Sequence, residues 1–433
     1  MIPQLIFFLF VVAAIAWFSF NVRKIIRNIN LGRSTNRSDR LVERLMTMLK
    51  VAFGQTKMTK RPVAAILHFF VYVGFIIINL EVLEIIIDGL FGTHRIFASP
   101  LGGLYNVLIG SFEILAALVL IGVIAFYARR NFLKIKRFTG VEMTNWPRSD
   151  ANYILIIETL LMIAFLTMNA ADYRLQQLGT LHYVNAGSFP VSSLIAPLLP
   201  NSESALILIE RSAWWFHILG ILAFLNYLPY SKHFHIILAF PNTYYSNLEP
   251  KGEFTNMPSV TNEVKAMLDP SFTPEPIVEG SRFGAKDVPD LTWKNLMEAY
   301  TCTECGRCTA VCPANITGKL LSPRKIMMDT RDRMEEIGRN IDKHGKDFKD
   351  GRSLLNDYIS QEEIWACTTC NACTEACPVN IDPLAIIMEL RRYSVMEESQ
   401  ASASLNNMFN NTENNGAPWK YSPSDRFNWA ERN

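Results

Sequence analysis

The sequence predicts an all-α protein, in which a five-helix transmembrane bundle is followed by a smaller, mostly helical domain in the cytoplasm. Long apolar runs recur through the first 240 of its 433 residues, and all eight cysteines fall in two matching runs near the C-terminal end. The expected divisions are a membrane domain over residues 1–240, a linker over 241–290, a cysteine-bearing domain over 291–398 and an extended, partner-docking tail over 399–433.

The apolar runs are each near the length of about 20 residues that crosses a bilayer as a helix. They lie at residues 2–20, 63–87, 104–127, 153–170 and 206–227. Buried helices of a large soluble core are the alternative, but such helices carry charge on a solvent face and most of these runs do not. The first run lacks a basic leader and is followed by Arg23, Lys24 and Arg27, which predicts an uncleaved anchor rather than a signal peptide.

Lysine and arginine in the connecting loops predict the orientation, because basic loops are retained in the cytoplasm. The loop between the first two runs carries eleven of them, from Arg23 to Arg61, whereas the loops on the other side carry only Arg95 and Arg174. The loop after the third run also belongs to the basic side, with Arg129, Arg130, Lys134, Lys136 and Arg137. We therefore expect a multi-pass protein of the inner, cytoplasmic membrane, with its N-terminus outside and everything after about Tyr230 in the cytoplasm.

The first basic loop is explained by this topology and by contact with anionic lipid, so no nucleic-acid partner is expected. The net charge of +2 hides the asymmetry between the loops. Within this loop, apolar residues at helical spacing predict an amphipathic helix on the inner membrane surface. These residues are Leu41, Leu45, Met48, Leu49 and Phe53.

The two cysteine runs predict a pair of [4Fe–4S] clusters. They read C-T-E-C-G-R-C-T-A-V-C-P and C-T-T-C-N-A-C-T-E-A-C-P, and a constant offset of 65 positions indicates an internal duplication. In this spacing three thiolates of one loop bind one cluster, and the fourth cysteine, before the proline, binds the other. One cluster is thus assigned Cys302, Cys305, Cys308 and Cys377, and the second is assigned Cys367, Cys370, Cys373 and Cys312.

Two alternatives to clusters fit less well. A zinc ribbon needs two C-x-x-C pairs without the additional cysteines, and disulfides belong to oxidising compartments. Ser322-Pro323 and Asp382-Pro383 have the form of helix starts, with a polar N-cap and proline in the first turn. These starts predict a mostly helical ferredoxin domain rather than the small βαβ type.

Three histidines are placed where haem b could bind between helices: His68, His217 and His235. His217 and His235 are 18 residues apart, about 27 Å on a helix, and so cannot ligate one iron. If the fifth helix continues through Pro229 to Phe240, His235 lies at the depth of His68, and these two form a pair. His217 would then face the outer half, with His94 or His182 as partner or with no second haem.

Two other interpretations of the histidines stay open. One is a single haem between His68 and His217, which a shorter fifth helix would favour. The other is a hydrogen-bonded interior histidine without any haem, although ionisable groups in spans are usually functional. Three acids, Glu81, Glu84 and Glu113, fall in the outer halves of the second and third spans. They are expected either to handle protons or to pair helices by hydrogen bonds.

The membrane part resembles the gamma subunit of respiratory nitrate reductase and the cytochrome b subunits of membrane heterodisulfide reductase. The matching stretches are R-P-V-A-A-I-L-H, W-W-F-H and L-P-Y-S-K-H-F-H, which contain His68, His217 and His235. The nitrate reductase subunit has two haem-ligating histidines on its second helix, whereas this chain has one. The resemblance therefore implies an inner haem b and leaves the outer one open.

The cysteine part resembles the iron–sulfur subunit of heterodisulfide reductase and the membrane oxidoreductases that link electron-transfer flavoprotein to menaquinone. The resemblance is carried by the first cysteine run and by T-G-K-L-L-S-P-R-K after it. Such relatives continue into cysteine-rich CCG domains, which would begin where this tail reads N-N-G-A-P-W. We expect a separate CCG-domain subunit to dock on the tail aromatics, which are Trp419, Tyr421, Phe427 and Trp429.

These patterns together predict a membrane subunit of a respiratory electron-transfer complex. Electrons would pass between a cytoplasmic partner, such as electron-transfer flavoprotein, and membrane quinone of the menaquinone type, with Glu81, Glu84 and Glu113 as quinone proton candidates. The alternative from a different class is a membrane-anchored iron–sulfur redox sensor or assembly factor without turnover. A haem b that responds to quinol would favour electron transfer, and a lack of haem would favour the sensor.

Overall fold

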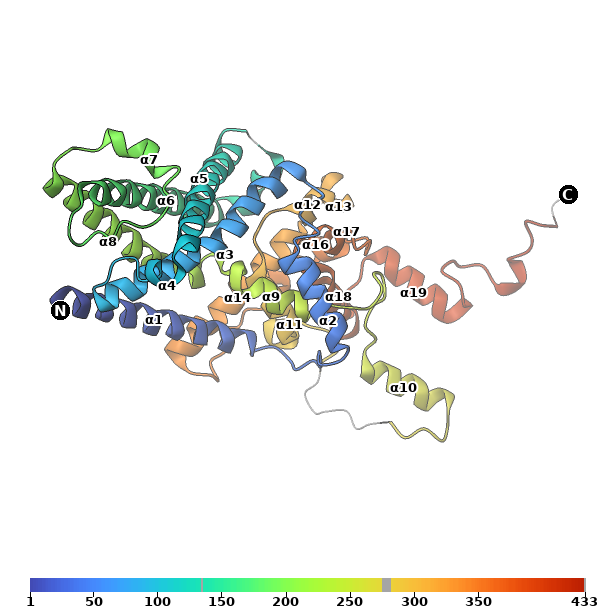
Figure 1. Ribbon diagram of the computed structural model, residues 1–433. Coiled ribbons are helices and arrows are strands. Elements are labelled where there is room, and N and C mark those ends of the chain that lie inside the picture. The colour runs from blue at the N-terminus through green and yellow to red at the C-terminus, as the bar shows by residue number, and fades with distance from the viewer. Residues whose placement is uncertain (134, 275–281, 432–433) are drawn as a thin grey trace.

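The computed structural model describes residues 1–133, 135–274 and 282–431 (Figure 1). Lys134, counted above among the basic loop residues, lies outside the described residues. The described chain is helical and contains no β-strand. Five helices are long and apolar enough to cross a membrane: α1 Ile2–Ile29, α3 Pro62–Phe91, α5 Gly103–Asn131, α6 Trp146–Leu178 and α8 Glu203–Tyr227. The predicted all-α class with five spanning helices is confirmed.

Helices α3, α5, α6 and α8 pack in sequence order, and α1 packs against α3 and α8. The bundle core is apolar, with Ile109, Phe112, Ala116, Phe165 and Ile218 almost fully buried. We call the end of the bundle that contacts the cysteine-bearing domain the near end and the opposite end the far end. The N-terminus lies at the far end, together with the short helices α4 Ala98–Leu101 and α7 Ser192–Ile195 (Figure 1).

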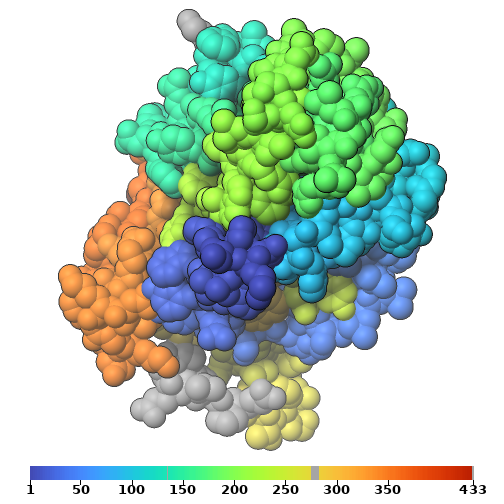
Figure 2. Space-filling model, turned by 60° about the vertical axis from the view of Figure 1, so that its left-hand side comes forward, coloured from blue at the N-terminus to red at the C-terminus, as the bar shows by residue number. Residues whose placement is uncertain are grey.

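Helix α1 is longer than its apolar run because its polar last turns have tertiary partners. Lys24 Nζ lies 2.9 Å from Asp342 Oδ2, and Asn28 Nδ2 donates to the Tyr300 hydroxyl at 2.9 Å. These contacts extend α1 to Ile29 and dock it on α11 Trp293–Thr301 and α14 Pro323–His344 of the cysteine-bearing domain. In Figure 2, α1 (dark blue) accordingly lies between the orange α14 region and the cyan far end of α3.

The fifth span does not continue through Pro229 to Phe240, so that assumption was wrong. Helix α8 ends at Tyr227, and two 3₁₀ turns follow, η5 Leu228–Tyr230 and η6 Lys232–Phe234. Pro229 has no N–H to continue an α-helical ladder, and Ser231 caps the next turn by accepting from the His233 N–H. A separate helix, α9 His235–Tyr244, then begins at His235.

The cysteine-bearing domain is built from short helices around α14 and α18. Its other helices are α12 Arg307–Val311, α13 Pro313–Ile316, α15 Leu354–Asp357, α16 Gln361–Trp365 and α17 Ala372–Ala376. The two predicted helix starts are confirmed: Ser322 caps α14, and Asp382 caps α18 Pro383–Met396 by accepting from the N–H groups of Leu384 and Ala385.

The segment after the first span forms α2 Leu41–Met48 and a π-helical turn, η1 Leu49–Phe53. This confirms a helix where one was expected. Leu41, Leu45 and Leu49 remain exposed, while Phe53 packs on Phe240 of α9 with ring centroids 4.6 Å apart.

The linker and the tail contain more helix than expected. The predicted linker includes α10 Pro258–Leu268, and its residues 275–281 lie outside the described residues. The tail was expected to be extended but contains α19 Ala403–Asn415, which leads away from the rest of the molecule (Figure 1). The tail aromatics are exposed, from 50% for Trp419 to 75% for Trp429. The helix forms because the run from Ala403 contains no proline or glycine before Gly416.

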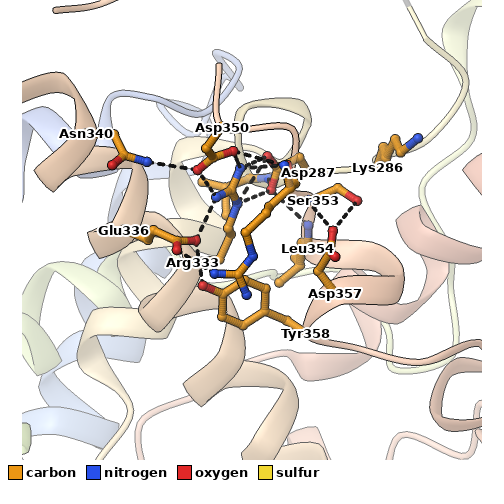
Figure 3. A network of polar contacts seen from close by, with 12 residues as sticks. Lys286, Asp287, Arg333, Glu336, Asn340, Asp350, Ser353, Leu354, Asp357 and Tyr358 are labelled. Carbon is orange, nitrogen blue, oxygen red and sulfur yellow. Dashed lines mark hydrogen bonds and ion pairs between the residues drawn. The ribbon is translucent and has the colours of Figure 1, made fainter. Parts of the chain in front are cut away.

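A buried arginine organises the start and middle of the cysteine-bearing domain (Figure 3). Arg333 of α14 is 3% exposed and bonds Asp287 at 2.8 Å, Asp350 at 2.6 Å and Glu336 at 2.8 Å. Asp287 lies in the segment that enters the domain, and Asp350 lies in the loop after α14. One guanidinium therefore ties three chain segments together.

We expect Arg333→Met to destabilise the domain by about 3 kcal/mol, because removing one member of a buried ion network leaves its partners uncompensated. Urea unfolding of the full-length protein in detergent, followed by tryptophan fluorescence, measures this loss. Arg339→Met is the matched control on the same helix. Arg339 is 69% exposed with a single pairing to Glu335 at 3.7 Å, so its loss should cost under about 0.5 kcal/mol. Equal effects of the two substitutions would contradict the role of Arg333.

Candidate functional site

The internal duplication extends from the cysteine spacing to the backbone. Glu304 and Gly306 in the first cysteine loop have positive φ angles of 53° and 69°, and Thr369 and Asn371 at the equivalent positions of the second loop have 57° and 57°. Each loop then enters a short helix, α12 or α17, and these two helices pack on one another. The left-handed residues turn each loop tightly enough to direct several cysteines inward.

A cavity brings together the four cysteines that the spacing assigned to one cluster. Cys302, Cys305 and Cys308 line it with Cys377 from the second run. The rest of the wall consists of Thr303, Gly306, Arg307, Arg324, Met327, Pro378, Val379, Ile381 and Pro383. Among the described residues, no three His, Cys, Asp or Glu side chains converge closely enough to bind a single metal ion. Four cysteines lining one cavity are the number and kind of ligands that one [4Fe–4S] cluster takes.

The second set is more open. Burial raises the pKa of the Cys367 thiol, and Cys312 and Cys370 act on it in the same direction while Arg391 opposes them. Cys312 of the first run therefore lies near the second loop. Cys370 is exposed, whereas Cys302, Cys312, Cys373 and Cys377 are buried.

The buried thiols need a positively charged partner to ionise. Burial raises the pKa of Cys302 and of Cys377 to about 12, and neighbouring cysteines add to the shift. Backbone N–H groups point at the sulfurs: Ile381 donates to Cys377 at 3.3 Å, and Thr369 donates to Cys367 at 3.4 Å. Iron ions would supply the missing positive charge, so the donor set fits iron–sulfur clusters.

The first cysteine loop contacts the near end of the bundle through buried charges. Glu304 accepts from Lys232, which precedes α9, and its other oxygen lies 2.8 Å from Arg331 Nη1. Burial alone would raise the pKa of the Glu304 carboxyl, but Arg331 and Lys232 outweigh it and hold the pKa below its ordinary value. Nearby, Arg324 of α14 pairs with Glu142 at 2.7 Å. No sequence pattern indicated these pairs, since their members are far apart in the chain.

Two of the three selected histidines gather at the near end, with a third that the sequence analysis missed. Burial lowers the pKa of His233 to about 3, and the nearby His235 and His68 contribute. The His233 and His235 rings are 5.5 Å apart. His235 Nδ1–H donates to the Lys232 carbonyl at 3.0 Å, which leaves Nε2 with the free lone pair. Only the position of His233 within K-H-F-H could have indicated it.

His217 lies apart from this group, in the core of the bundle. Its Nδ1–H donates to the Leu161 carbonyl at 3.0 Å, and its Nε2 is buried without a hydrogen-bond partner. One possible partner, His94, uses both ring nitrogens: Nε2 lies 3.1 Å from Asp172, and Nδ1 accepts from the Val184 N–H at 3.2 Å. His217 thus keeps a buried Nε2 without a partner, whereas both ring nitrogens of His94 are engaged.

The three glutamates have different environments at the far end. Glu84 accepts from the Phe97 N–H and the Tyr105 hydroxyl, and Glu113 accepts from the Val191 and Ser192 N–H groups. Both carboxylates therefore tie loops to helices.

Glu81 has a free oxygen. Its Oε1 lies 3.5 Å from Arg95 Nη1, while its Oε2 is buried without a partner. It lines a cavity of about 340 Å³ whose wall is aromatic at Phe7 and Trp214 and polar at His94 and Arg95. The cavity is large enough for the ring of a small ligand.

Comparison with known proteins agrees with the cysteine chemistry. A family model described as "4Fe-4S dicluster domain" matches residues 301–381. The chain is 30% identical to the probable iron-sulfur-binding oxidoreductase FadF of Bacillus subtilis, over all of this chain and 61% of that protein. It is 26% identical to EtfAB:quinone oxidoreductase of Syntrophomonas wolfei, over 92% of this chain and 55% of that protein.

A third relative matches only part of the chain. The probable membrane-anchored ferredoxin of Chromohalobacter salexigens is 30% identical over 34% of this chain and 24% of its own length. The chain thus spans less than two thirds of each of these three relatives, and no solved structure matches it. Five apolar helices and a membrane-anchored homologue indicate a membrane protein. The chain contains a 4Fe–4S dicluster domain and is a homologue of iron–sulfur oxidoreductases and electron-transfer proteins.

Proposed function

We propose that the protein is the membrane subunit of a respiratory electron-transfer complex. It would pass electrons between a cytoplasmic redox partner and membrane quinone through two [4Fe–4S] clusters and haem b. The observation that carries this proposal is the position of the cysteine cavity. Glu304, in the same loop as Cys302 and Cys305, contacts Lys232, and the Lys232 carbonyl accepts from His235. Groups suited to bind cofactors thus follow one another from the cysteine-bearing domain to the bundle.

The clusters would be held by the crossed sets of cysteines, with Cys377 completing the first loop and Cys312 completing the second. The shared cavity supports the first set, and the influence of Cys312 on Cys367 supports the second. Bound there, the clusters would supply one-electron transfer. The chain would contribute N–H donors to the sulfurs and exclude water by burial.

Cys312→Ser should therefore remove the cluster of the second loop, and Cys377→Ser should remove that of the first loop. Iron counting and electron paramagnetic resonance on the two variants measure this, and each variant is the control for the other. If each substitution instead removed the cluster of its own run, the crossed assignment would be wrong.

His68 and His235 would hold haem b at the near end. Both lower the pKa of His233, so both lie near it. The Nδ1–H of His235 donates to a backbone carbonyl, as in many metal-ligating histidines. His217, with its free Nε2, would hold a second haem in the bundle core if another ligand is supplied. Under the orientation inferred from the loop charges, the near end faces the cytoplasm.

We expect His68→Ala and His235→Ala each to abolish the same haem signal, because both ligands are needed at one iron. His217→Ala should affect a different haem or none. Redox titration of the haem spectrum in each variant makes the comparison. His344→Ala is the control, since His344 is exposed at the end of α14 and should leave every haem unchanged. Loss of one shared haem in His68→Ala and His217→Ala would refute the pairing.

The quinone head group would bind in the far-end cavity, with Glu81 as the proton-exchanging group. The cavity combines aromatic walls with the free Glu81 oxygen, and its wall residue Trp214 is three positions before His217 on α8. The bonds that Glu84 and Glu113 make to backbone N–H groups favour structural roles for these two. The choice of menaquinone rests on the family resemblance alone.

Glu81→Gln should slow quinol oxidation by about a hundredfold, because general acid–base groups contribute at least that factor. The haem and cluster spectra should remain unchanged. Glu203→Gln is the control at the same end, because Glu203 is exposed, bonds Thr180 and lies outside the cavity. Normal quinol oxidation in Glu81→Gln would rule out a quinone site in this cavity.

The soluble partner would be a CCG-domain protein or electron-transfer flavoprotein. The name of the Syntrophomonas relative, EtfAB:quinone oxidoreductase, joins an EtfAB pair to a quinone, which supports a flavoprotein partner of that type. The exposed tail aromatics and the exposed Cys370 offer a surface for it.

A further inference from the structure

The two cysteine loops differ at one equivalent position that bears charge. Glu304 of the first loop and Thr369 of the second share the same left-handed backbone, but Glu304 is 3% exposed whereas Thr369 is partly exposed. The cysteine after Thr369, Cys370, is also exposed. At this position the first loop therefore has a buried carboxylate, whereas the second loop has a hydroxyl group.

The Glu304 carboxylate joins the first loop to the bundle. Lys232 Nζ donates to Glu304 and to the Pro147 carbonyl at 2.6 Å, and the Lys232 N–H donates to Asp150 of α6 at 3.2 Å. Arg331 of α14 holds the other Glu304 oxygen at 2.8 Å. The lysine is thus fixed at both its backbone and its side chain.

The same lysine orients His235. Its carbonyl accepts the Nδ1–H of His235 at 3.0 Å, so Lys232 contacts the first cysteine loop with its side chain and the histidine with its main chain. The second loop is linked instead to the segment just before α3, where Lys57 bonds the Thr374 carbonyl and Asn380 and Lys60 pairs with Glu375, but neither of these lysines bonds a histidine in the described structure.

We propose that the Lys232–Glu304 ion pair is a positioning element that holds the first cysteine loop against the His235 segment. It makes this loop the bundle-facing one and leaves the second loop, with exposed Cys370, to face the soluble partner. This inference rests on the proposed function, because it concerns the order in which the two cysteine loops serve the electron path.

The charges of the pair predict that removing either partner shifts the midpoint potential of the first loop's cluster, with opposite signs for the two partners. An uncompensated carboxylate beside the sulfurs disfavours an added electron, whereas an uncompensated cation favours it. Lys232→Met leaves Glu304 with Arg331 alone and should lower the midpoint potential of the first cluster. Glu304→Gln leaves Lys232 and Arg331 without their carboxylate and should raise it. A purely structural role would not produce opposite signs.

The test is potentiometric titration of the full-length protein, with the two clusters resolved by electron paramagnetic resonance. Thr369→Ala is the matched control at the equivalent position and should leave the first cluster unshifted. If Lys232→Met binds iron poorly, Lys232→Arg is the second variant. It keeps the positive charge, so its first cluster should have the wild-type midpoint potential. We also expect slower haem reduction from the clusters in Lys232→Met and Glu304→Gln, but not in Thr369→Ala.

Shifts of the same sign, no shift, or equal shifts of both clusters would overturn the positioning role. The proposed function is judged separately by the wild-type spectrum. Absence of haem b from the wild-type protein would refute the haem pathway, whereas the potentials of the variants would still report on the ion pair.

Discussion

The apolar core of the cysteine-bearing domain is continuous with the near end of the membrane bundle, and the rest of the structure depends on this shared core. Ile25 of α1 and Leu228 and Phe234 beside α9 are buried in one cluster with Leu296 and the cysteines Cys302, Cys312 and Cys377. Burial of apolar surface is the main favourable term in folding, so neither part completes its core without the other. The cysteine loops are thereby held at a defined position relative to the helices.

Charged groups buried along this core fix the position more precisely. Apolar packing is non-directional, but a buried ion pair is tolerated only where both partners meet with good geometry. Two buried pairs, Lys232 with Glu304 and Arg324 with Glu142, connect the bundle or its loops to the cysteine-bearing domain, and the more exposed pair of Lys24 with Asp342 adds a third link. A rotation of the domain would separate several of these pairs at once, each at a desolvation cost.

Buried charges are also paired at the far end of the bundle, but there one carboxylate is only partly compensated. Arg95 is buried between Asp172 at 2.6 Å and Glu81 at 3.5 Å, and it also donates to Asn169 at 2.9 Å. The two carboxylates compensate the buried charge of Arg95, but one oxygen of Glu81 remains unpaired beside a cavity.

The sequence by itself determined the helical class, the five spans, the two cysteine loops and the N-caps at Ser322 and Asp382. These features depend on local composition, period and spacing, which act over about 20 residues or fewer. It also predicted the grouping of Cys377 with the first loop, because in this motif the fourth cysteine of each run binds the cluster of the other run. The predictions of an extended tail and of a continuous fifth helix were wrong. Both required weighing helix propensity against helix breaks such as that at Pro229.

Only the tertiary structure distinguished Glu81 from Glu84 and Glu113, brought His233 beside His235, and joined Lys232 to Glu304. The three glutamates are equivalent in sequence terms, as acids in apolar runs, and differ only in which loops return to meet them. Whether a buried charge is paired depends on residues tens to hundreds of positions away. Packing decides those distances, and because the free energy of a buried charge changes steeply with its nearest partner, the roles of these side chains follow from the fold.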